Sequence, residues 1–544
     1  MENKIHRFLK HQFSVNTKTR ALAVFAGIGF SVSTVFAGAV PHTSYPSMMS
    51  AKHDEGYGIH PIFTVGETIH GYMPEGLLDG MAAFKKDDYT VRVLVNHELT
   101  PDKGYPYELV NGVKLTGARV SYFDIDATTR NIKDACSAYK RAYDRNRRLV
   151  KHPSQINESG SDTDGFARFC SGAGYAAGEY RFEDDIYFTC EETSADDGHP
   201  HGGSIWAIDV KKRNIHAVPV LGRGAWENVT ALTTPDEDHI ALLLGDDSES
   251  APLYLWIGKK SDDGRFLFKN GLQQGTLYVW KSDTGELSPE DFHTTGSMLS
   301  GTFVKIKQRD TSKAGQPGYD ENGYLDDTTL RSAADALGAF SFSRPEDLHT
   351  NPENGTQAAF ASTGRGSLFP SDDWGTVYLV NIQFSYDAHA ELIADASITI
   401  LHDCDDYGDF GVRSPDNLTW ASDGYIYVQE DKSTKTGVFG GDSGIEASIW
   451  RIDPNTSDFV RIAVMDRAVV APAGSTDSDP SDIGDWESSG IIDVTKLFNT
   501  LEGETLFLFN VQAHSIRDGL IEENNLVQGG QLLFLNRWKD IKHE

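Results

Sequence analysis

The stretch from Gly203 to Asp209 reads GSIWAID, and it decides the predicted fold because related stretches recur along the chain. Residues 447–453 read ASIWRID, residues 275–280 read GTLYVW and residues 375–380 read GTVYLV. Each is typical of a short β-strand before a polar turn, and a second strand follows the first copy at residues 215–218. Many short strands with repeated hairpins favour a β-propeller over a sandwich. We therefore predict an all-β fold, a six-bladed β-propeller.

Three stretches interrupt this pattern and are predicted to be insertions. Residues 134–151 are rich in Arg, Lys and Tyr and are predicted to be helical. Residues 287–340 are polar and irregular before a helical piece at residues 330–337, and residues 471–490 resemble an exposed loop. In a propeller, such helical and loop insertions cover one face, where function commonly lies.

The N-terminus has the anatomy of a secretory signal peptide. Residues 4–20 are basic, residues 21–36 are apolar with Gly and Ser, and Ala37 is a small residue at the expected cleavage point. No second apolar segment approaches the ~20 residues that span a bilayer. We expect residues 1–37 to be removed, residues 38–544 to form one propeller domain, and the product to be periplasmic or extracellular without stable membrane insertion.

The chain is strongly acidic. It has 49 Lys and Arg against 80 Asp and Glu, for a formal net charge of −31. Cleavage would remove five basic residues and one acidic residue and change this charge to −35. Such a charge disfavours nucleic acid and anionic membrane as partners but suits divalent cations. We expect a monomer that binds no nucleic acid.

Cysteine usage leaves two roles open. The chain has four cysteines, Cys136, Cys170, Cys190 and Cys404. In an exported protein the default expectation is two disulfides, although four cysteines are too few for a disulfide scaffold in a chain of this length. A metal–thiolate role for one of them remains open.

Several motifs place acidic or amide side chains beside predicted strand ends. They are NHE at 96–98, CEE at 190–192, GRGAWEN at 222–228, GDD at 245–247, SRPED at 343–347 and SPDN at 414–417. Alone, each is more often a solvated loop, but propeller blades converge on one axis and bring distant residues together. Oxygen-rich clusters there suit Ca²⁺, and a thiolate selects a softer or redox metal. Arg344 is the natural clamp for an oxyanion.

Other catalytic chemistries have less support in the sequence. The chain has no Gly-x-Ser-x-Gly elbow and no Gly-Lys-Ser/Thr phosphate loop, and the second His of a zincin helix is missing after His97-Glu98. The pair His199 and His201 could bind zinc, but two histidines in a loop more often face solvent.

In their order along the chain, these motifs resemble the PhoX family of exported alkaline phosphatases, from about residue 60 to about residue 435. Further carriers of the resemblance are CSGAG at 170–174, LGR at 221–223 leading to Glu227, and RSAADALGA at 331–339 leading to Arg344. The resemblance implies a six-bladed propeller with an axial cluster of ferric iron and calcium. It also implies that the chain hydrolyses phosphomonoesters with a metal-bound oxygen nucleophile.

The same resemblance implies roles for individual residues. Arg344 is expected to bind phosphate and Asn96 to line the site, and these two are the predicted catalytic residues. Cys170 matches the iron-bound cysteine of the family better than Cys190 does. The predicted metal set, which includes the paired carboxylates of the motifs, is Glu98, Cys170, Glu191, Glu192, Glu227, Asp246, Asp247, Glu346 and Asp416.

The chain also departs from the family pattern, as a diverged member would. Asp347 stands where the family has an aromatic residue, and Trp226 stands where it has a histidine. The N-terminal basic segment lacks a twin-arginine pair. Two alternatives therefore remain beside the phosphatase: a calcium-dependent lactonase-type hydrolase, suggested by SPDNL at 414–418, and a non-catalytic, calcium-binding secreted propeller.

Overall fold

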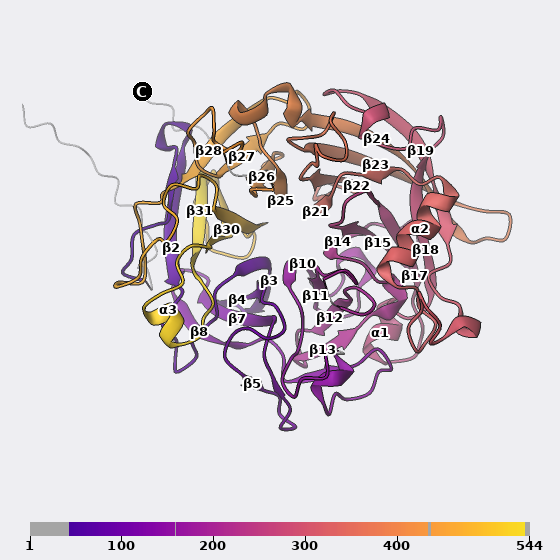
Figure 1. The fold of residues 1–544 in the computed structure, drawn as a ribbon, viewed down its shortest axis with the longest axis horizontal. Helices are drawn as coiled ribbons and strands as arrows, with labels where there is room; N and C mark the ends of the chain where they lie inside the picture. The colour runs from indigo at the N-terminus through magenta and orange to yellow at the C-terminus, as the bar shows by residue number, and fades with distance from the viewer. Residues whose placement is uncertain (1–42, 158, 198, 434–436, 539–544) are drawn as a thin grey trace, which may run out of the picture. The chain divides into compact units, whose positions relative to one another are not determined.

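β-strands dominate the structure, a computed structural model that describes residues 43–157, 159–197, 199–433 and 437–538. The sheets are arranged around a common axis in the manner of a propeller (Figure 1), so the predicted all-β class is confirmed. The predicted signal peptide lies outside the described residues. The α-helices among the described residues are α1 (Phe266–Lys269), α2 (Asp327–Leu337) and α3 (Leu520–Glu523).

The first two large sheets are built from consecutive antiparallel strands. One sheet has the order β3 (Leu78–Asp87), β4 (Thr90–His97), β7 (Arg119–Asp126), β8 (Ile132–Ser137). The other has the order β10 (Phe169–Tyr175), β11 (Ile186–Glu191), β12 (Ile205–Asp209), β13 (Asn214–Ala217), β9 (Arg141–Tyr143). Strand β9 joins the second sheet by parallel pairing with β13.

A nine-stranded sheet follows and begins and ends near the axis. Its order is β14 (Trp226–Leu232), β15 (His239–Asp246), β17 (Tyr254–Lys259), β18 (Gly275–Ser282), β19 (Met298–Ile306), β24 (Leu392–Asp403), β23 (Thr376–Tyr386), β22 (Asn354–Ser362), β21 (Pro345–Asn351). Strand β19 pairs with β18 on one side and with β24 on the other. It therefore links two four-stranded halves.

The last two large sheets each take in a strand from the N-terminal part of the chain. One has the order β25 (Pro415–Trp420), β26 (Ile426–Glu430), β27 (Ser448–Ile452), β28 (Phe459–Met465), β1 (Met49–Ala51). The other has the order β29 (Trp486–Asp493), β30 (Glu504–Ala513), β31 (Gly529–Trp538), β2 (Tyr57–Thr64). Two small pairs join β5 (Tyr107–Glu108) to β6 (Lys114–Leu115) and β16 (Ala251–Pro252) to β20 (Ser341–Phe342).

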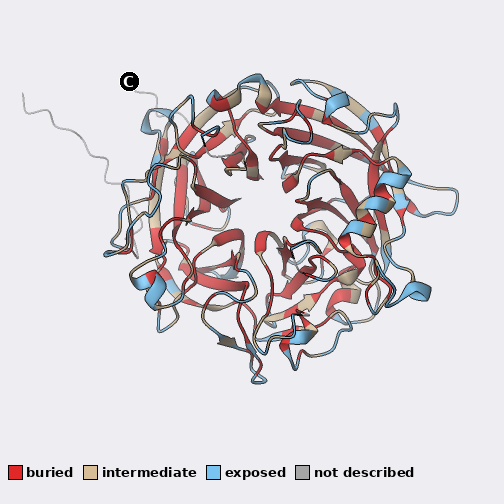
Figure 2. Cartoon of the chain, in the orientation of Figure 1, coloured by how far each residue is buried: buried red, intermediate tan, exposed pale blue. Residues whose placement is uncertain are grey.

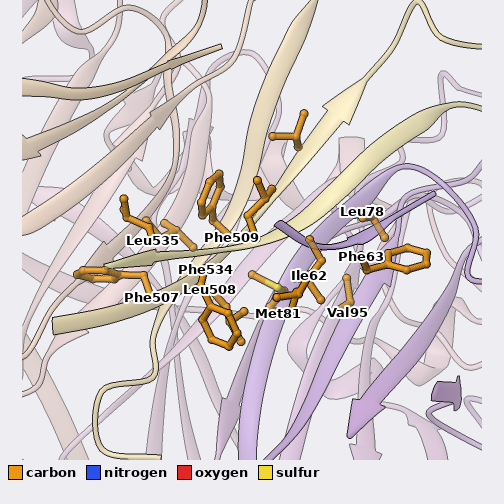
Figure 3. Packing of buried hydrophobic residues seen from close by; sticks show 14 of the residues in the cluster. Ile62, Phe63, Leu78, Met81, Val95, Phe507, Leu508, Phe509, Phe534 and Leu535 are labelled. Carbon is orange, nitrogen blue, oxygen red and sulfur yellow. The ribbon is translucent and has the colours of Figure 1, made fainter. Parts of the chain in front are cut away.

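The apolar faces of these sheets pack against one another. Exposed residues gather on the outer loops and on α2, whereas most strand residues are buried (Figure 2). Between the first and last sheets, for example, Phe63, Met81, Leu508 and Phe534 lie in one buried cluster (Figure 3). Each such side chain contributes about 1.5–3 kcal/mol relative to leaving it in water. Pairing of β2 with β31 and burial of this cluster tie the two ends of the chain together.

The repeated sequence motif occupies a consistent place in the sheets. Its copies at residues 203–209, 447–453 and 375–380 supply β12, β27 and β23, each the third strand from the axis. The copy at residues 275–280 supplies β18, the fourth strand from β14. Trp206 and Trp450 are both buried, because this strand is covered on each face by a neighbouring sheet.

Six described strands nearest the axis, which we call the inner strands, contact one another in the order β3, β10, β14, β21, β25, β29 and back to β3. In the first five, the pairing register shifts directly after the first residue pair. Such a bulge releases the next residues from regular alternation and re-aims their side chains. The bulges therefore decide what faces the axis at this end of the strands.

Two of the predicted insertions are wrong in detail. Residues 134–151 are not helical, because they contain the end of β8 and all of β9. Tyr122 pairs with Cys136 and His216 with Tyr143, so cross-strand pairing overrides the local composition. Residues 287–340 contain the long strand β19, although the predicted helix at 330–337 is confirmed within α2. Residues 471–485 lie outside any strand, and β29 begins at Trp486.

The four cysteines, all described, are unpaired, so the default expectation of two disulfides is wrong. They lie on separate strands or turns: Cys136 in β8, Cys170 in β10, Cys190 in β11 and Cys404 after β24. Among the described residues, no helix combines the length and apolar character needed to cross a bilayer.

Candidate active site and metal-binding residues

A cavity of about 630 Å³ lies at the starting ends of the inner strands. The second residue of every inner strand lines it, although these residues are widely separated in sequence. They are Asp79, Cys170, Glu227, Glu346, Asp416 and Glu487. We call these six residues the inner layer. Five acids and a thiol thus converge because each strand begins in the same way.

A second set of side chains lies just outside the inner layer. Each inner strand pairs with a second strand, and the residue that directly follows this second strand also lines the cavity in five of the six cases. These residues are Glu98, Glu192, Asp247, Asp431 and His514. In the sixth case the residue is Thr363, whose hydroxyl donates to Glu346. The cavity is therefore lined by two tiers of polar groups.

Three groups of side chains bring their ligand atoms close enough to hold a metal ion. The groups are Asp79 with Glu98 and Cys170, Cys170 with Glu192 and Glu227, and Glu227 with Glu346 and Asp416. Within each group the ligand atoms lie within 4.8 Å of one another. Since Cys170 and Glu227 each belong to two groups, the three sites adjoin.

Glu227 gives the clearest indication that a cation belongs here. Its side chain is fully buried, and neither carboxylate oxygen has a hydrogen-bond partner among the described residues. Burial, followed by the neighbouring Asp416 and Glu346, raises the pKa of Glu227 well above its usual range. A buried carboxylate among other carboxylates is costly unless a cation neutralises it. The residues present therefore fit a bound metal.

Cys170 also fits a metal ligand. Its Sγ lies 3.5 Å from Oδ2 of Asp79, whose other oxygen lacks a partner among the described residues. Burial, then the charge of Asp79, raises the pKa of the Cys170 thiol well above its usual range. The thiolate form would thus need a nearby cation. Cys190 instead lies fully buried within an apolar cluster between sheets.

Two arginines reach the same cavity from equivalent positions, two residues before an inner-layer residue. Arg344 precedes Glu346, and its Nε and Nη2 each lie 2.7 Å from an oxygen of Asp247. Arg168 precedes Cys170, and its Nη2 lies 2.9 Å from Glu98 and 2.6 Å from Glu192. Such guanidinium groups can bind a planar or tetrahedral oxyanion.

A comparison with known protein families assigns the chain to one of them. A family model described as "Alkaline phosphatase PhoX" matches residues 51–448, which is most of the chain. The chain belongs to the PhoX alkaline phosphatase family. The predicted family membership is therefore confirmed, as is the prediction of a phosphoric monoester hydrolase.

One solved structure supports the fold of this PhoX-family chain. Pseudomonas fluorescens PhoX in complex with vanadate, a transition state analogue, superposes with a TM-score of 0.59 at 16% identity, covering 92% of this chain and 97% of that chain. A puromycin-hydrolyzing peptidase of Mycobacterium tuberculosis has a TM-score of only 0.32 at 9% identity, over 87% of this chain and 61% of that chain, too low to support any inference. A search of curated proteins finds no match.

Most of the predicted site residues of this PhoX-family chain line the cavity. They are Glu98, Cys170, Glu192, Glu227, Asp247, Arg344, Glu346 and Asp416. Glu191 and Asp246 do not, because each ends a second strand and is held within the sheets. Glu191 accepts from the backbone N–H groups of Ala167 and Ser204, at 3.1 and 3.0 Å, and Asp246 accepts from Arg331.

Asn96 also lies outside the cavity and supports its wall. Its Nδ2 donates to the backbone carbonyls of Cys170 and Ser171, at 2.7 and 3.0 Å. Its Oδ1 accepts from the hydroxyls of Tyr187 and Thr189, at 2.8 and 3.0 Å. With every polar atom in use, Asn96 fixes the bulge that carries Cys170 rather than contacting a ligand.

The charged or titratable lining residues that are absent from the predicted set are Asp79, Lys103, Arg168, Asp431, Glu487, His514 and Arg517. One of them had a detectable signal: residues 224–227 read GAWE and residues 484–487 read GDWE, so the strand start that carries Glu227 is repeated at Glu487. Asp79 and Arg168 have no such copy. Their place follows from the topology, which puts the starts of all inner strands at one end of the axis.

The departures from the family pattern and the histidine pair have structural explanations. Trp226 is fully buried against Tyr254, with ring centroids 5.5 Å apart. Asp347 is buried just beneath the inner layer, and burial raises its pKa to about 7. His199 is buried, and its Nδ1 lies 3.4 Å from the guanidinium of Arg223, a neighbour that disfavours zinc.

Proposed function

We propose that the acidic cavity is the active site and that it hydrolyses phosphomonoesters with calcium and ferric iron bound to its carboxylates and to Cys170. The observation that carries this proposal is the fully buried Glu227, whose two oxygens have no partner among the described residues. Four other acids lie close enough to raise its pKa: Asp416, Glu346, Glu192 and Asp79. The residues that would hold the metals are Asp79, Glu98, Cys170, Glu192, Glu227, Glu346 and Asp416. Metals held there would neutralise the phosphate and activate water for attack.

Arg344 is proposed to bind the phosphoryl oxygens. Its two hydrogen bonds to Asp247 hold the guanidinium plane in a fixed orientation beside Glu346. A preorganised donor is most valuable where charge develops in the transition state, on the equatorial oxygens of the phosphoryl group. Arg168 lies on the other side of Glu227's strand in the equivalent position, and we propose that it binds the same group more weakly.

Two broader assignments belong to this proposal. We count six blades, with the nine-stranded sheet taken as two blades linked through β19, and the closed series of six inner strands supports this count. We also propose that residues 1–37 direct export and that the enzyme acts as a monomer in the periplasm or outside the cell. The basic and apolar pattern of the N-terminus supports export.

The decisive experiment combines metal analysis with kinetics on one purified sample. We expect iron and calcium in the protein, hydrolysis of phenyl phosphate, and loss of activity on chelation with EGTA that calcium restores. A sample that is full of calcium but lacks iron, and that cleaves lactones rather than phosphate esters, would overturn the proposal. Inhibition by orthovanadate serves as an independent check of phosphoryl transfer.

A further inference from the structure

The cavity extends beyond the carboxylates to two loops, between β4 and β5 and between β30 and β31. Besides members of the two tiers of polar groups, these loops contribute six lining residues: Thr100, Lys103, Arg517, Asn525, Val527 and Gln528. We call this part the outer lobe. None of these described residues is a carboxylate, although the chain as a whole has a net charge of −31. The lining of the outer lobe therefore carries two cationic side chains, Lys103 and Arg517, and no carboxylate.

Arg517 is the most available cation of the outer lobe. It is exposed, and its Nε donates to the backbone carbonyl of His514 at 2.7 Å, which fixes the base of the guanidinium. Among the described residues, no carboxylate pairs with it. Lys103 has a partner, Asp102 at 2.8 Å, but both side chains are more than half exposed. An exposed pair of this kind is weak, so an anion can compete for Lys103.

The other side of the site has the opposite character. A smaller cavity of about 230 Å³ adjoins Arg344 and is lined by Asp197 and Glu249 as well as by Arg365. There Arg365 is already paired with Glu249, with its Nε 2.7 Å from the carboxylate. An anionic group in this smaller cavity would meet four carboxylates, since Glu192 and Asp247 line it as well, and two arginines that are already paired with carboxylates. Charge therefore favours the outer lobe for such a group.

The main cavity is also large enough for more than a phosphate. Its volume of about 630 Å³ lies within the range of pockets that enclose small organic ligands. With the phosphoryl group beside Arg344 and the inner layer, the alcohol part of the ester has room to extend toward Lys103 and Arg517. Resting on the proposed function, we propose that the outer lobe binds the alcohol part and that the preferred substrates are phosphomonoesters whose alcohol carries a second anionic group.

The test compares two esters that differ in this charge, phenyl phosphate and 3-carboxyphenyl phosphate, whose leaving phenols have similar acidity. With the metal-loaded enzyme at low ionic strength, we expect kcat/KM to be about tenfold higher for the carboxylated ester, the size of one charged contact. In the double variant Lys103→Ala/Arg517→Ala this ratio should fall at least fivefold. Added salt should lower it in the wild type as well.

The matched control is Lys85→Ala/Arg265→Ala. Lys85 and Arg265 are exposed, each is paired with a neighbouring aspartate, and neither lines the cavity. This variant removes the same formal charge and should leave the ratio unchanged. The single variant Arg365→Ala tests the smaller cavity. If the ratio of the two kcat/KM values falls in Arg365→Ala but not in Lys103→Ala/Arg517→Ala, the proposal is overturned.

The remaining outcomes separate this inference from the proposed function. Equal kcat/KM for the two esters in the wild type would overturn the inference while leaving the phosphatase intact. Failure of the metal-loaded protein to hydrolyse either ester would overturn both. Thermal unfolding of each variant checks that lost discrimination does not reflect lost folding.

Discussion

Two adjacent layers of the same inner strands differ in the hydrogen-bond partners that they give to their buried carboxylates. In the inner layer, Glu227 has no hydrogen-bond partner among the described residues and faces Asp416 and Glu346. One residue further along a neighbouring strand, Asp347 accepts from the Ser171 hydroxyl at 3.2 Å, from the backbone N–H groups of Leu348 and Leu418 at 2.9 and 3.0 Å, and from the Asn228 amide.

The difference indicates which layer needs an external partner. Burial raises the pKa of both carboxyl groups, but the neighbours of Glu227 are other acids, whereas those of Asp347 are neutral donors. A folded protein normally satisfies its buried polar groups, and sites that break this rule are functional candidates. The carboxylates of the inner layer therefore need bound cations, whereas Asp347 in the layer beneath already has its hydrogen-bond donors.

The largest expected effect comes from removing the charge of Glu227. We expect Glu227→Gln to lose metal and to lower kcat by at least about a thousandfold, because the residue joins two of the three ligand groups. Metal analysis and phenyl phosphate kinetics measure this. The matched variant Asp347→Asn should retain metal and lose less than about tenfold. Similar effects of the two variants would contradict the proposed division between the layers.

Two of the three buried thiols sharpen the same comparison. Cys170 lies in the inner layer near Asp79, whereas Cys190 lies within an apolar cluster. We expect Cys170→Ser to lose iron and at least about a hundredfold in kcat, because a hydroxyl is a poorer ligand than a thiolate for this metal. Cys190→Ser should keep its iron and instead lose about 1–3 kcal/mol of stability through burial of a hydroxyl. Iron loss confined to Cys190→Ser would exchange the two assignments.

The arginines are expected to act on substrate rather than on metal. Arg344→Ala should lower kcat/KM about a hundredfold and weaken inhibition by orthovanadate, while the metal content stays unchanged. Arg168→Ala should lower kcat/KM by about tenfold, because its side chain is 41% exposed, whereas that of Arg344 is 20% exposed. Wild-type kinetics in Arg344→Ala would show that phosphate binds elsewhere.

The sequence could predict the inner layer where a motif marks the strand start, as at Glu227, Glu346 and Asp416. It could not separate Glu191 from Glu192 or Asp246 from Asp247, because which acid of a pair faces the cavity depends on where the second strand ends. Asp79 and Arg168 stand in no repeated motif. They reach the site only because the topology places the starts of all inner strands at one end of the axis. Long-range pairing also turned the basic stretch 134–151 into strands.

The smallest expected effect concerns a buried acid that, like Asp347, has only neutral donors. Asp372 accepts from the hydroxyls of Ser343 and Thr376, and burial raises its pKa to about 6 from an ordinary value of 3.8. Because the folded-state pKa is the higher one, this carboxyl favours folding when protonated. Its contribution is complete below about pH 4 and is lost as the pH rises through about 6.

Asp372→Asn imitates the protonated form, so it should be close to wild type in stability at pH 4 and more stable at pH 8. The shift from 3.8 to about 6 corresponds to at most about 3 kcal/mol, and the loss of one acceptor lowers the gain. Denaturant unfolding of both proteins across this pH range measures the difference. A constant difference at every pH would mean that the Asp372 carboxyl has the same pKa in the folded and unfolded states, and that neutral donors suffice to hold a buried carboxylate ionised.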